Sequence, residues 1–151
     1  MTNMIQSAKD QVAALTQTAY ERAAAAGALP AGAEVRATIE IPKDTAHGDY
    51  ASSFAMAGAK ALHMAPRAIA QVIVDHLELE GSYFGKVEIA GPGFLNFTLG
   101  PKWYRDVLSA IETQGAGYGS GAGGAGKKVM VEFVSANPTG PMHMGNARGG
   151  V

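Results

Sequence analysis

Hydrophobic residues recur every three or four positions in four stretches of the chain, which is the period of an amphipathic helix. These stretches cover residues 3–26 and 50–64, a third that begins at Pro66 and a fourth that begins at Pro101. Proline suits the first turn of a helix because its missing amide has no partner there. We therefore predict four helices. In the fourth, the predicted apolar face consists of Trp103, Val107, Leu108 and Ile111.

Three other stretches follow the period of a strand. Apolar and polar residues alternate over 35–41, and residues 83–90 and 94–99 are joined by the turn-forming segment Gly91-Pro92-Gly93. This composition predicts an antiparallel hairpin. Since side chains alternate between the faces of a strand, Leu95 and Phe97 share one face and Asn96 points to the other.

Asn96 is a candidate binding residue on this hairpin. On the face away from the core, its amide can hydrogen-bond to the edge of a nucleobase. The alternative is that it completes a turn or a cross-strand hydrogen bond, and the pattern alone does not decide between the two. His47, in the polar loop 42–49, is interpreted as a solvated side chain, with a ligand contact as the alternative.

The order of these elements predicts an α+β fold with a small, mainly antiparallel sheet covered by helices. We place this domain at residues 1–114. Seven of the twelve residues 115–126 are glycine, which is typical of a flexible linker, here assigned to 115–127. Two motif-like strings in it are rejected. The string GSGAGG at 119–124 lies after a helix and before a strand, the reverse of a dinucleotide site, and the P-loop-like string at 121–128 lacks the required Ser or Thr.

The last part of the chain, residues 128–151, begins with an apolar run that predicts a buried strand over 129–134. Two prolines in the segment 135–141 then prevent either a strand or a helix from continuing. A helix is predicted to start at Met142 or His143. Its first backbone amides and its dipole favour an anion such as a phosphate. His143 and Asn146 lie on one face of its first turn, and Gly145 lets a ligand approach the backbone.

Composition limits the possible partners. The 47% hydrophobic and 17% charged content is typical of a globular protein, and the net charge of −1 argues against holding nucleic acid by bulk electrostatics. The absence of cysteine excludes disulfides and thiolate metal sites, and no metal site is expected. No apolar run is long enough to span a membrane. We expect a cytoplasmic protein without membrane or DNA partners.

Three strings along the chain resemble one family. Residues 135–150, SANPTGPMHMGNARGG, resemble the signature region of class I aminoacyl-tRNA synthetases, specifically of bacterial arginyl-tRNA synthetase. Residues 48–52, GDYAS, and 91–97, GPGFLNF, resemble two stretches of the additional N-terminal domain of these enzymes. The signature is usually written His-Ile-Gly-His, and here Asn146 stands in place of the second histidine. This substitution retains a hydrogen-bond donor but excludes a positive charge.

The resemblance implies an arginine-tRNA ligase that activates L-arginine with ATP and Mg²⁺ and transfers it to tRNA(Arg). It assigns His143, Gly145 and Asn146 to ATP binding and catalysis. It assigns Glu132, Ser135 and Asn137 to arginine. A further argument for Glu132 is that an acid at the end of a buried strand is costly unless it meets a cation. The alternative is an edge-strand charge facing water. The N-terminal domain is implied to contact tRNA, with Asn96 as a candidate residue.

The resemblance also implies that residues 128–151 are the first strand and helix start of a Rossmann-like catalytic domain. We therefore expect an N-terminal fragment of a monomeric synthetase that is inactive alone and binds no cofactor. Two other hypotheses remain open. One is a free-standing tRNA- or RNA-binding module without ATP chemistry, and the other is a different class I transferase.

Overall fold

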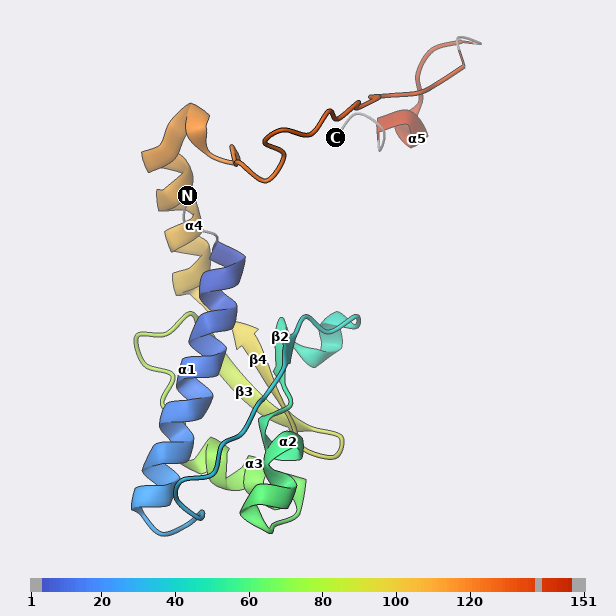
Figure 1. Ribbon diagram of the computed structural model, residues 1–151. Helices are drawn as coiled ribbons and strands as arrows, with labels where there is room; N and C mark the ends of the chain where they lie inside the picture. The colour runs from blue at the N-terminus through green and yellow to red at the C-terminus, as the bar shows by residue number, and fades with distance from the viewer. Residues whose placement is uncertain (1–3, 138–139, 148–151) are drawn as a thin grey trace. The chain divides into compact units, whose positions relative to one another are not determined.

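The chain is described by a computed structural model that covers residues 4–137 and 140–147. It divides into two compact units, Met1–Tyr118 and Gly119–Val151. The elements in chain order are α1 (Met4–Ala25), β1 (Ile39–Glu40), η1 (Thr45–His47), β2 (Tyr50–Ser52), α2 (Phe54–Leu62), α3 (Pro66–Asp75), β3 (Phe84–Ala90), β4 (Phe94–Leu99), α4 (Pro101–Gln114), η2 (Gly115–Gly117) and α5 (Met144–Ala147) (Figure 1).

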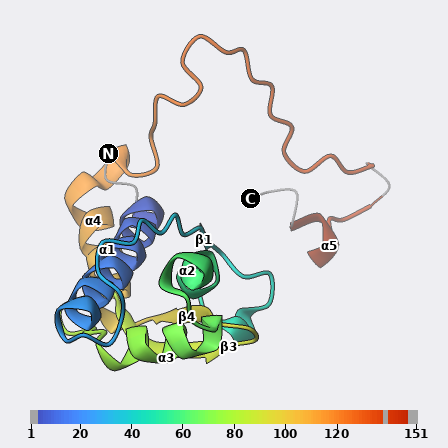
Figure 2. The ribbon, with the colours of Figure 1, turned by 60° about the horizontal axis from the view of Figure 1, so that its bottom comes forward.

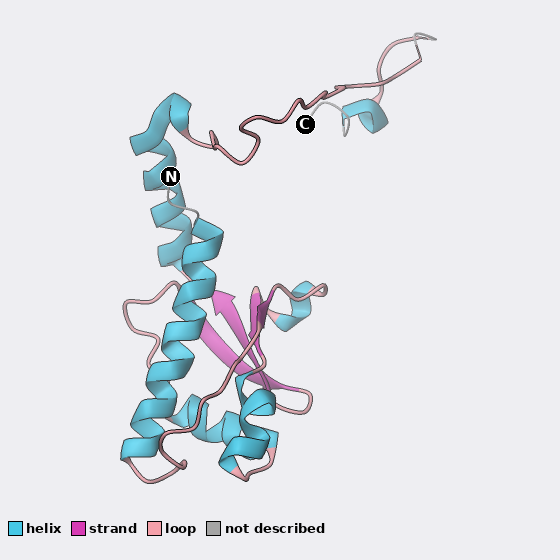
Figure 3. Cartoon of the chain, viewed as in Figure 1, coloured by secondary structure: helices cyan, strands magenta, loops and turns pink. Residues whose placement is uncertain are grey.

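The first unit contains a four-stranded sheet in the order β1-β2-β4-β3, in which every neighbouring pair is antiparallel. Figure 3 shows strands of this unit in magenta and the helices in cyan. The helices α1, α2 and α3 contact this sheet (Figure 2). The prediction of an α+β fold with a small antiparallel sheet covered by helices is confirmed, and so is the β3–β4 hairpin.

The core lies between the sheet and these three helices. Leu95 and Phe97 of β4 are fully buried and belong to the same cluster as Val12 of α1 and Ile69 of α3. Phe84 of β3 meets Phe97 edge-on, with 5.3 Å between the ring centroids. Such aromatic contacts add to the free energy gained from burial. The periodic patterns predicted for α1 and α3 therefore mark the faces that are buried.

A tight junction joins β2 to β4 just before Tyr50. The backbone N–H of Asp49 donates to the carbonyl of Phe97 at 2.8 Å, and its carboxylate accepts the N–H of Leu99 at 2.7 Å. Gly48 has a φ of +79°, and a Cβ there would lie 2.8 Å from the Phe97 carbonyl oxygen. Burial, followed by the nearby Asp49 carboxylate, raises the pKa of the Tyr50 phenol. The GDY string is thus explained by its structural role.

Two predicted elements are wrong in part. Residues 50–52 form strand β2 instead of the start of a helix, because their backbone pairs with β1 and β4. The strand predicted over 35–41 is reduced to Ile39–Glu40. Its partner β2 is only three residues long and is followed after Ser53 by helix α2, so the residues before Ile39 have no strand to pair with.

Helix α4 is present as predicted, but its apolar face is only partly covered. Trp103 packs against the core, whereas Leu108 and Ile111 are 62% and 39% exposed. No residue of α4 is classed as buried. The predicted apolar face is therefore present, but the core covers it only near Trp103.

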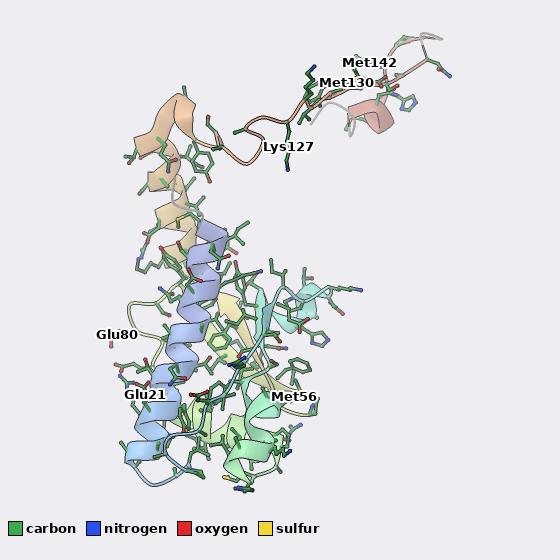
Figure 4. The ribbon with its side chains drawn as sticks, in the orientation of Figure 1. Glu21, Met56, Glu80, Lys127, Met130 and Met142 are labelled. Carbon is green, nitrogen blue, oxygen red and sulfur yellow. The ribbon has the colours of Figure 1, made fainter. Side chains whose placement is uncertain are left out.

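The predicted strand over 129–134 is absent. The described residues 127–137 contain no helix or strand, and Val129, Met130 and Phe133 are largely exposed. Figure 4 labels Met130 on this segment. A strand requires a neighbouring strand for its backbone hydrogen bonds, and no described residue of this unit supplies one. The expected first strand of a Rossmann-like domain is therefore not formed here.

Replacing Gly48 with alanine is predicted to weaken the β2–β4 junction. The change forces alanine to a positive φ, at a cost of about 1–2 kcal/mol, and pushes its Cβ against Phe97. Gly81→Ala is a matched control, since Gly81 has a φ of +74° and nothing within 4 Å of the added carbon. In urea titrations we expect Gly48→Ala to lose at least about 1 kcal/mol more unfolding free energy than the control. Equal losses would contradict a close contact at this junction.

Candidate functional site

The second unit contains a hollow formed by the segment before α5. The hollow has a volume of about 520 Å³ and is lined by Ser135, Ala136, Asn137, Gly140, Pro141, Met142, His143 and Asn146. We call it the loop hollow. Four residues predicted to bind the substrates therefore share one concave surface: Ser135, Asn137, His143 and Asn146.

Side chains cap the start of α5. His143 directly precedes the first helical residue, and its Nδ1 accepts the backbone N–H of Gly145 at 3.1 Å. In return, Oδ1 of Asn146 accepts the backbone N–H of His143 at 3.0 Å. This reciprocal pattern is that of a capping box, with His and Asn replacing the usual Ser and Glu. The helix starts at Met144, one residue after the later of the two predicted starts, Met142 and His143.

The capping bonds use acceptors and leave donors free. With Nδ1 as acceptor, a neutral His143 ring carries its proton on Nε2. Asn146 likewise keeps its side-chain NH₂ group. Neither donor forms a hydrogen bond with another described residue. The geometry thus leaves two N–H donors at the loop hollow, and such donors suit an anion.

Gly145 lies next to the His143 ring and does not line the hollow. A Cβ at this position would lie 2.9 Å from Cε1 and 3.0 Å from Nδ1 of His143. The missing side chain therefore makes room for the capping ring. This role differs from the predicted one, in which the glycine lets a ligand approach the backbone.

Glu132 is exposed and does not line the loop hollow. The predicted buried strand that would place its carboxylate beside a cation is not formed. Its side chain faces water, but on a segment without a strand, so neither of the two interpretations given for it describes this conformation.

A second concave site lies in the first unit, on the face of the sheet opposite the core. We call it the sheet-face pocket. Its volume is about 340 Å³, and it is lined by Glu40, Pro42, His47, Ala51, Ala90, Gly91, Pro92, Phe94 and Asn96. Most of this lining is apolar. A pocket of this kind with a few polar groups is typical of a site for a small molecule or for one ring of a larger ligand.

Asn96 lies in the floor of the sheet-face pocket. It pairs with Ala51 of β2 on one side and Glu88 of β3 on the other, and only 7% of its surface is exposed. Its side chain makes no hydrogen bond with another described residue. As predicted, it points away from Leu95 and Phe97. Solvent reaches the polar atoms of this amide, so a ligand in the pocket can hydrogen-bond to them.

Local hydrogen bonds shape the walls of the pocket. The carboxylate of Asp44 accepts the N–H of Ala46 at 2.9 Å and caps the short helix η1, which ends at His47. On the opposite side, the β3–β4 turn contributes Gly91 and Pro92. His47 lines the pocket, and its side chain is exposed, as expected of a solvated residue.

Of the nine residues that line this pocket, sequence reasoning singled out only Asn96 and His47 as candidates, and Phe94 and Glu40 are two of those it missed. Phe94 precedes Asn96 by two positions on the same strand. The alternation of side chains along a strand therefore places both on one face, and Phe94 could have been predicted from this spacing. The position of Glu40 in the pocket could not be predicted from the local sequence. It depends on the pairing of β1 with β2 and of β2 with β4.

Within the described ranges, no group of three or more His, Cys, Asp or Glu side chains is arranged to hold a metal ion. Among the helices described, none combines the length and apolar character needed to cross a bilayer.

Comparisons with known proteins give a consistent result. Residues 6–99 match the family model described as "Arginyl tRNA synthetase N terminal domain". This span contains every strand of the sheet and all the residues that line the sheet-face pocket.

Similar proteins extend the match over almost the whole chain. The chain is 46% identical over 150 residues to the arginine-tRNA ligase of Acetivibrio thermocellus, an alignment that covers 99% of this chain and 27% of that protein. It is 51% identical over 112 residues to the arginine-tRNA ligase of Desulforudis audaxviator, with 74% and 20% covered. The chain thus spans 27% of the length of the first relative.

A solved structure shows the same fold. The arginyl-tRNA synthetase of Plasmodium falciparum aligns with a TM-score of 0.54 at 13% identity, covering 68% of this chain and 18% of that one.

Substituting Asn96 with leucine is predicted to leave the fold intact. The amide has no partner among the described residues, and leucine has a similar volume, so we expect the unfolding free energy to stay within about 1 kcal/mol or to rise. Leu95→Ala, one residue earlier but in the core, is the contrasting variant and should lose about 2–5 kcal/mol. Urea denaturation measures both. A loss above about 2 kcal/mol for Asn96→Leu would mean that the amide holds the fold together.

Proposed function

The chain belongs to the arginyl-tRNA synthetase family, and from this we propose that it is the N-terminal part of an arginine-tRNA ligase. The main support is that alignment with such ligases runs through both units, over 99% of the chain at 46% identity. The aligned part of this chain includes the residues that line the sheet-face pocket and those that line the loop hollow. The proposed reaction is ATP-dependent activation of L-arginine, followed by transfer of arginine to tRNA(Arg).

In the proposed activation step, a carboxylate oxygen of arginine attacks the α-phosphorus of ATP in line, and the bond to pyrophosphate breaks. Catalysis of this kind depends mainly on positioning and on stabilising negative charge on the phosphate oxygens. We assign this task to His143 and Asn146. Their free N–H donors at the loop hollow support the assignment. Gly145 would act by leaving room for the His143 ring.

We assign arginine binding to Glu132, Ser135 and Asn137. Ser135 and Asn137 lie in the same hollow as His143. Glu132 would need a neighbouring strand to fix its carboxylate near the arginine guanidinium, where a paired carboxylate and guanidinium form strong hydrogen bonds. We propose that the longer protein provides this strand and that residues 1–151 alone are inactive. Mg²⁺ would enter with the phosphates of ATP, and the enzyme would act as a cytoplasmic monomer.

We assign tRNA binding in the first unit to the sheet-face pocket. Its apolar lining suits a nucleobase removed from its stack, its Phe94 ring offers a surface for base stacking, and the Asn96 amide offers a donor and an acceptor. The small side chain of Ala51 leaves room above the floor. The net charge of −1 fits recognition by shape at one place.

The alternative is a free-standing tRNA-binding module without ATP chemistry. The observation that favours it is that the sheet-face pocket is complete within the first unit. It predicts tRNA binding by this chain but no arginine-dependent pyrophosphate release by any longer product of the same gene.

A histidine substitution tests the catalytic assignment. In the longer gene product, with arginine and tRNA(Arg) present, His143→Ala should lower arginine-dependent pyrophosphate release by roughly 10²–10³-fold, because one phosphate donor is removed. The affinity for tRNA should not change. Met142→Ala, also at the hollow, is the control. A loss below about threefold for His143→Ala would exclude the histidine from catalysis.

Two pocket variants test the tRNA assignment. Asn96→Leu and Phe94→Leu should each weaken binding of a tRNA(Arg) transcript to this chain by roughly tenfold, the usual effect of losing one base contact. Thr98→Val, on the same sheet face but outside the pocket lining, should bind like the unmodified chain. Fluorescence titration provides the dissociation constants. If the three variants bind equally well, the pocket does not hold a base.

A further inference from the structure

The start of α3 contacts the turn that forms one wall of the sheet-face pocket. An Nη1 N–H of Arg67, the second residue of α3, donates to the carbonyl oxygen of Gly91 at 3.0 Å. Gly91 and the following Pro92 both line the pocket. Arg67 therefore reaches the pocket wall from outside without lining the pocket itself.

A second contact joins the same two segments. Gly93 has a φ of +143°, and a Cβ at this position would lie 2.9 Å from the carbonyl carbon of Pro66 and 3.0 Å from its oxygen. The turn is thus seated directly on the first residue of α3. On its other side, the N–H of Gly93 donates to the carbonyl of Ala90 at 3.1 Å.

The position of Arg67 has no explanation within its own helix. A cation in the first turn opposes the helix dipole, and the first turn of α3 contains no acidic residue to offset it. Arg67 is exposed and forms no ion pair among the described residues. Its one hydrogen bond to a described residue goes to the carbonyl of Gly91 in the turn. This contact therefore explains why an arginine at this position is useful.

We propose that Arg67 is a positioning residue for the sheet-face pocket and that it fixes the Gly91-Pro92 wall at the distance from Asn96 that admits a base. The turn contains two glycines with positive φ, which other residues rarely adopt and which leave the backbone many alternatives. A wall held in advance lowers the entropy lost on binding. This proposal rests on the assignment of the pocket to tRNA.

The test uses this chain, a tRNA(Arg) transcript and the variant Arg67→Met, which removes the donor but keeps most of the aliphatic stem. We expect roughly fivefold to tenfold weaker binding and an unchanged melting temperature. Arg67→Lys, which retains a donor that can reach a carbonyl, should recover part of the affinity. Arg105→Met, at an exposed arginine of α4, is the matched control and should bind normally.

Two further readouts separate positioning from other roles. Because both residues act through one pocket, Arg67→Met combined with Asn96→Leu should weaken binding by less than the product of the two single effects. The salt dependence of binding should keep its slope. A reduced slope would show a direct phosphate contact instead, and fully multiplicative losses would overturn the proposal.

A measurement without tRNA distinguishes the failure of this proposal from the failure of the proposed function. In the free chain, Arg67→Met should speed amide hydrogen exchange at Gly93, whose N–H is bonded to the carbonyl of Ala90, whereas Arg105→Met should not. If the unmodified chain binds no tRNA, the proposed function of the pocket fails, and the exchange rates still decide whether Arg67 holds the turn. Unchanged exchange in Arg67→Met overturns the positioning role.

Discussion

The junction between β2 and β4 is the constraint on which the first unit depends. Asp49 ties the two strands through its backbone N–H to Phe97 and through its carboxylate to Leu99, and Gly48 permits this approach. The same pairing places Phe97 in the core and Ala51 beside Asn96 on the other face. A change at this junction therefore affects both the packing of the core and the shape of the pocket.

The elements that could be predicted from the sequence are those specified by local pattern. The helices from Pro66 and Pro101 begin at the expected residues, and the hairpin turn at Gly91-Pro92-Gly93 is where its composition predicts it. Strand β2 could not be predicted, because it exists only through partners far along the chain, and Tyr50 also fits a helical pattern. The strand expected over 129–134 fails for the related reason that its partners are not among the described residues. An apolar segment becomes a buried strand only where neighbouring strands and helices pack against it, and the local sequence does not specify those neighbours.

The two candidate sites differ in how far apart their parts lie in sequence. The capping contacts at the loop hollow join His143 to residues at most three positions away, so short-range hydrogen bonds define them. Because the contacts are local, the residues of this site could be predicted from one continuous stretch of sequence. The sheet-face pocket combines β1, η1, β2 and the β3–β4 hairpin, and only the pair Phe94 and Asn96 was accessible from local spacing. Its proposed role in binding tRNA therefore requires the folded first unit, whereas the proposed chemistry requires further strands.

Several of the buried core residues on the helices are alanines, including Ala8, Ala19 and Ala23 on α1, Ala55 on α2 and Ala70 on α3. An alanine side chain has no rotamers, so burying it involves no loss of side-chain conformational entropy. It also gains less from leaving water than a leucine does. Alanine side chains thus allow helices α1, α2 and α3 to pack closely, and their burial costs no side-chain conformational entropy. Substitution by a larger residue at these positions would force the helices apart, so the domain has little freedom to gain stability by enlarging its core side chains.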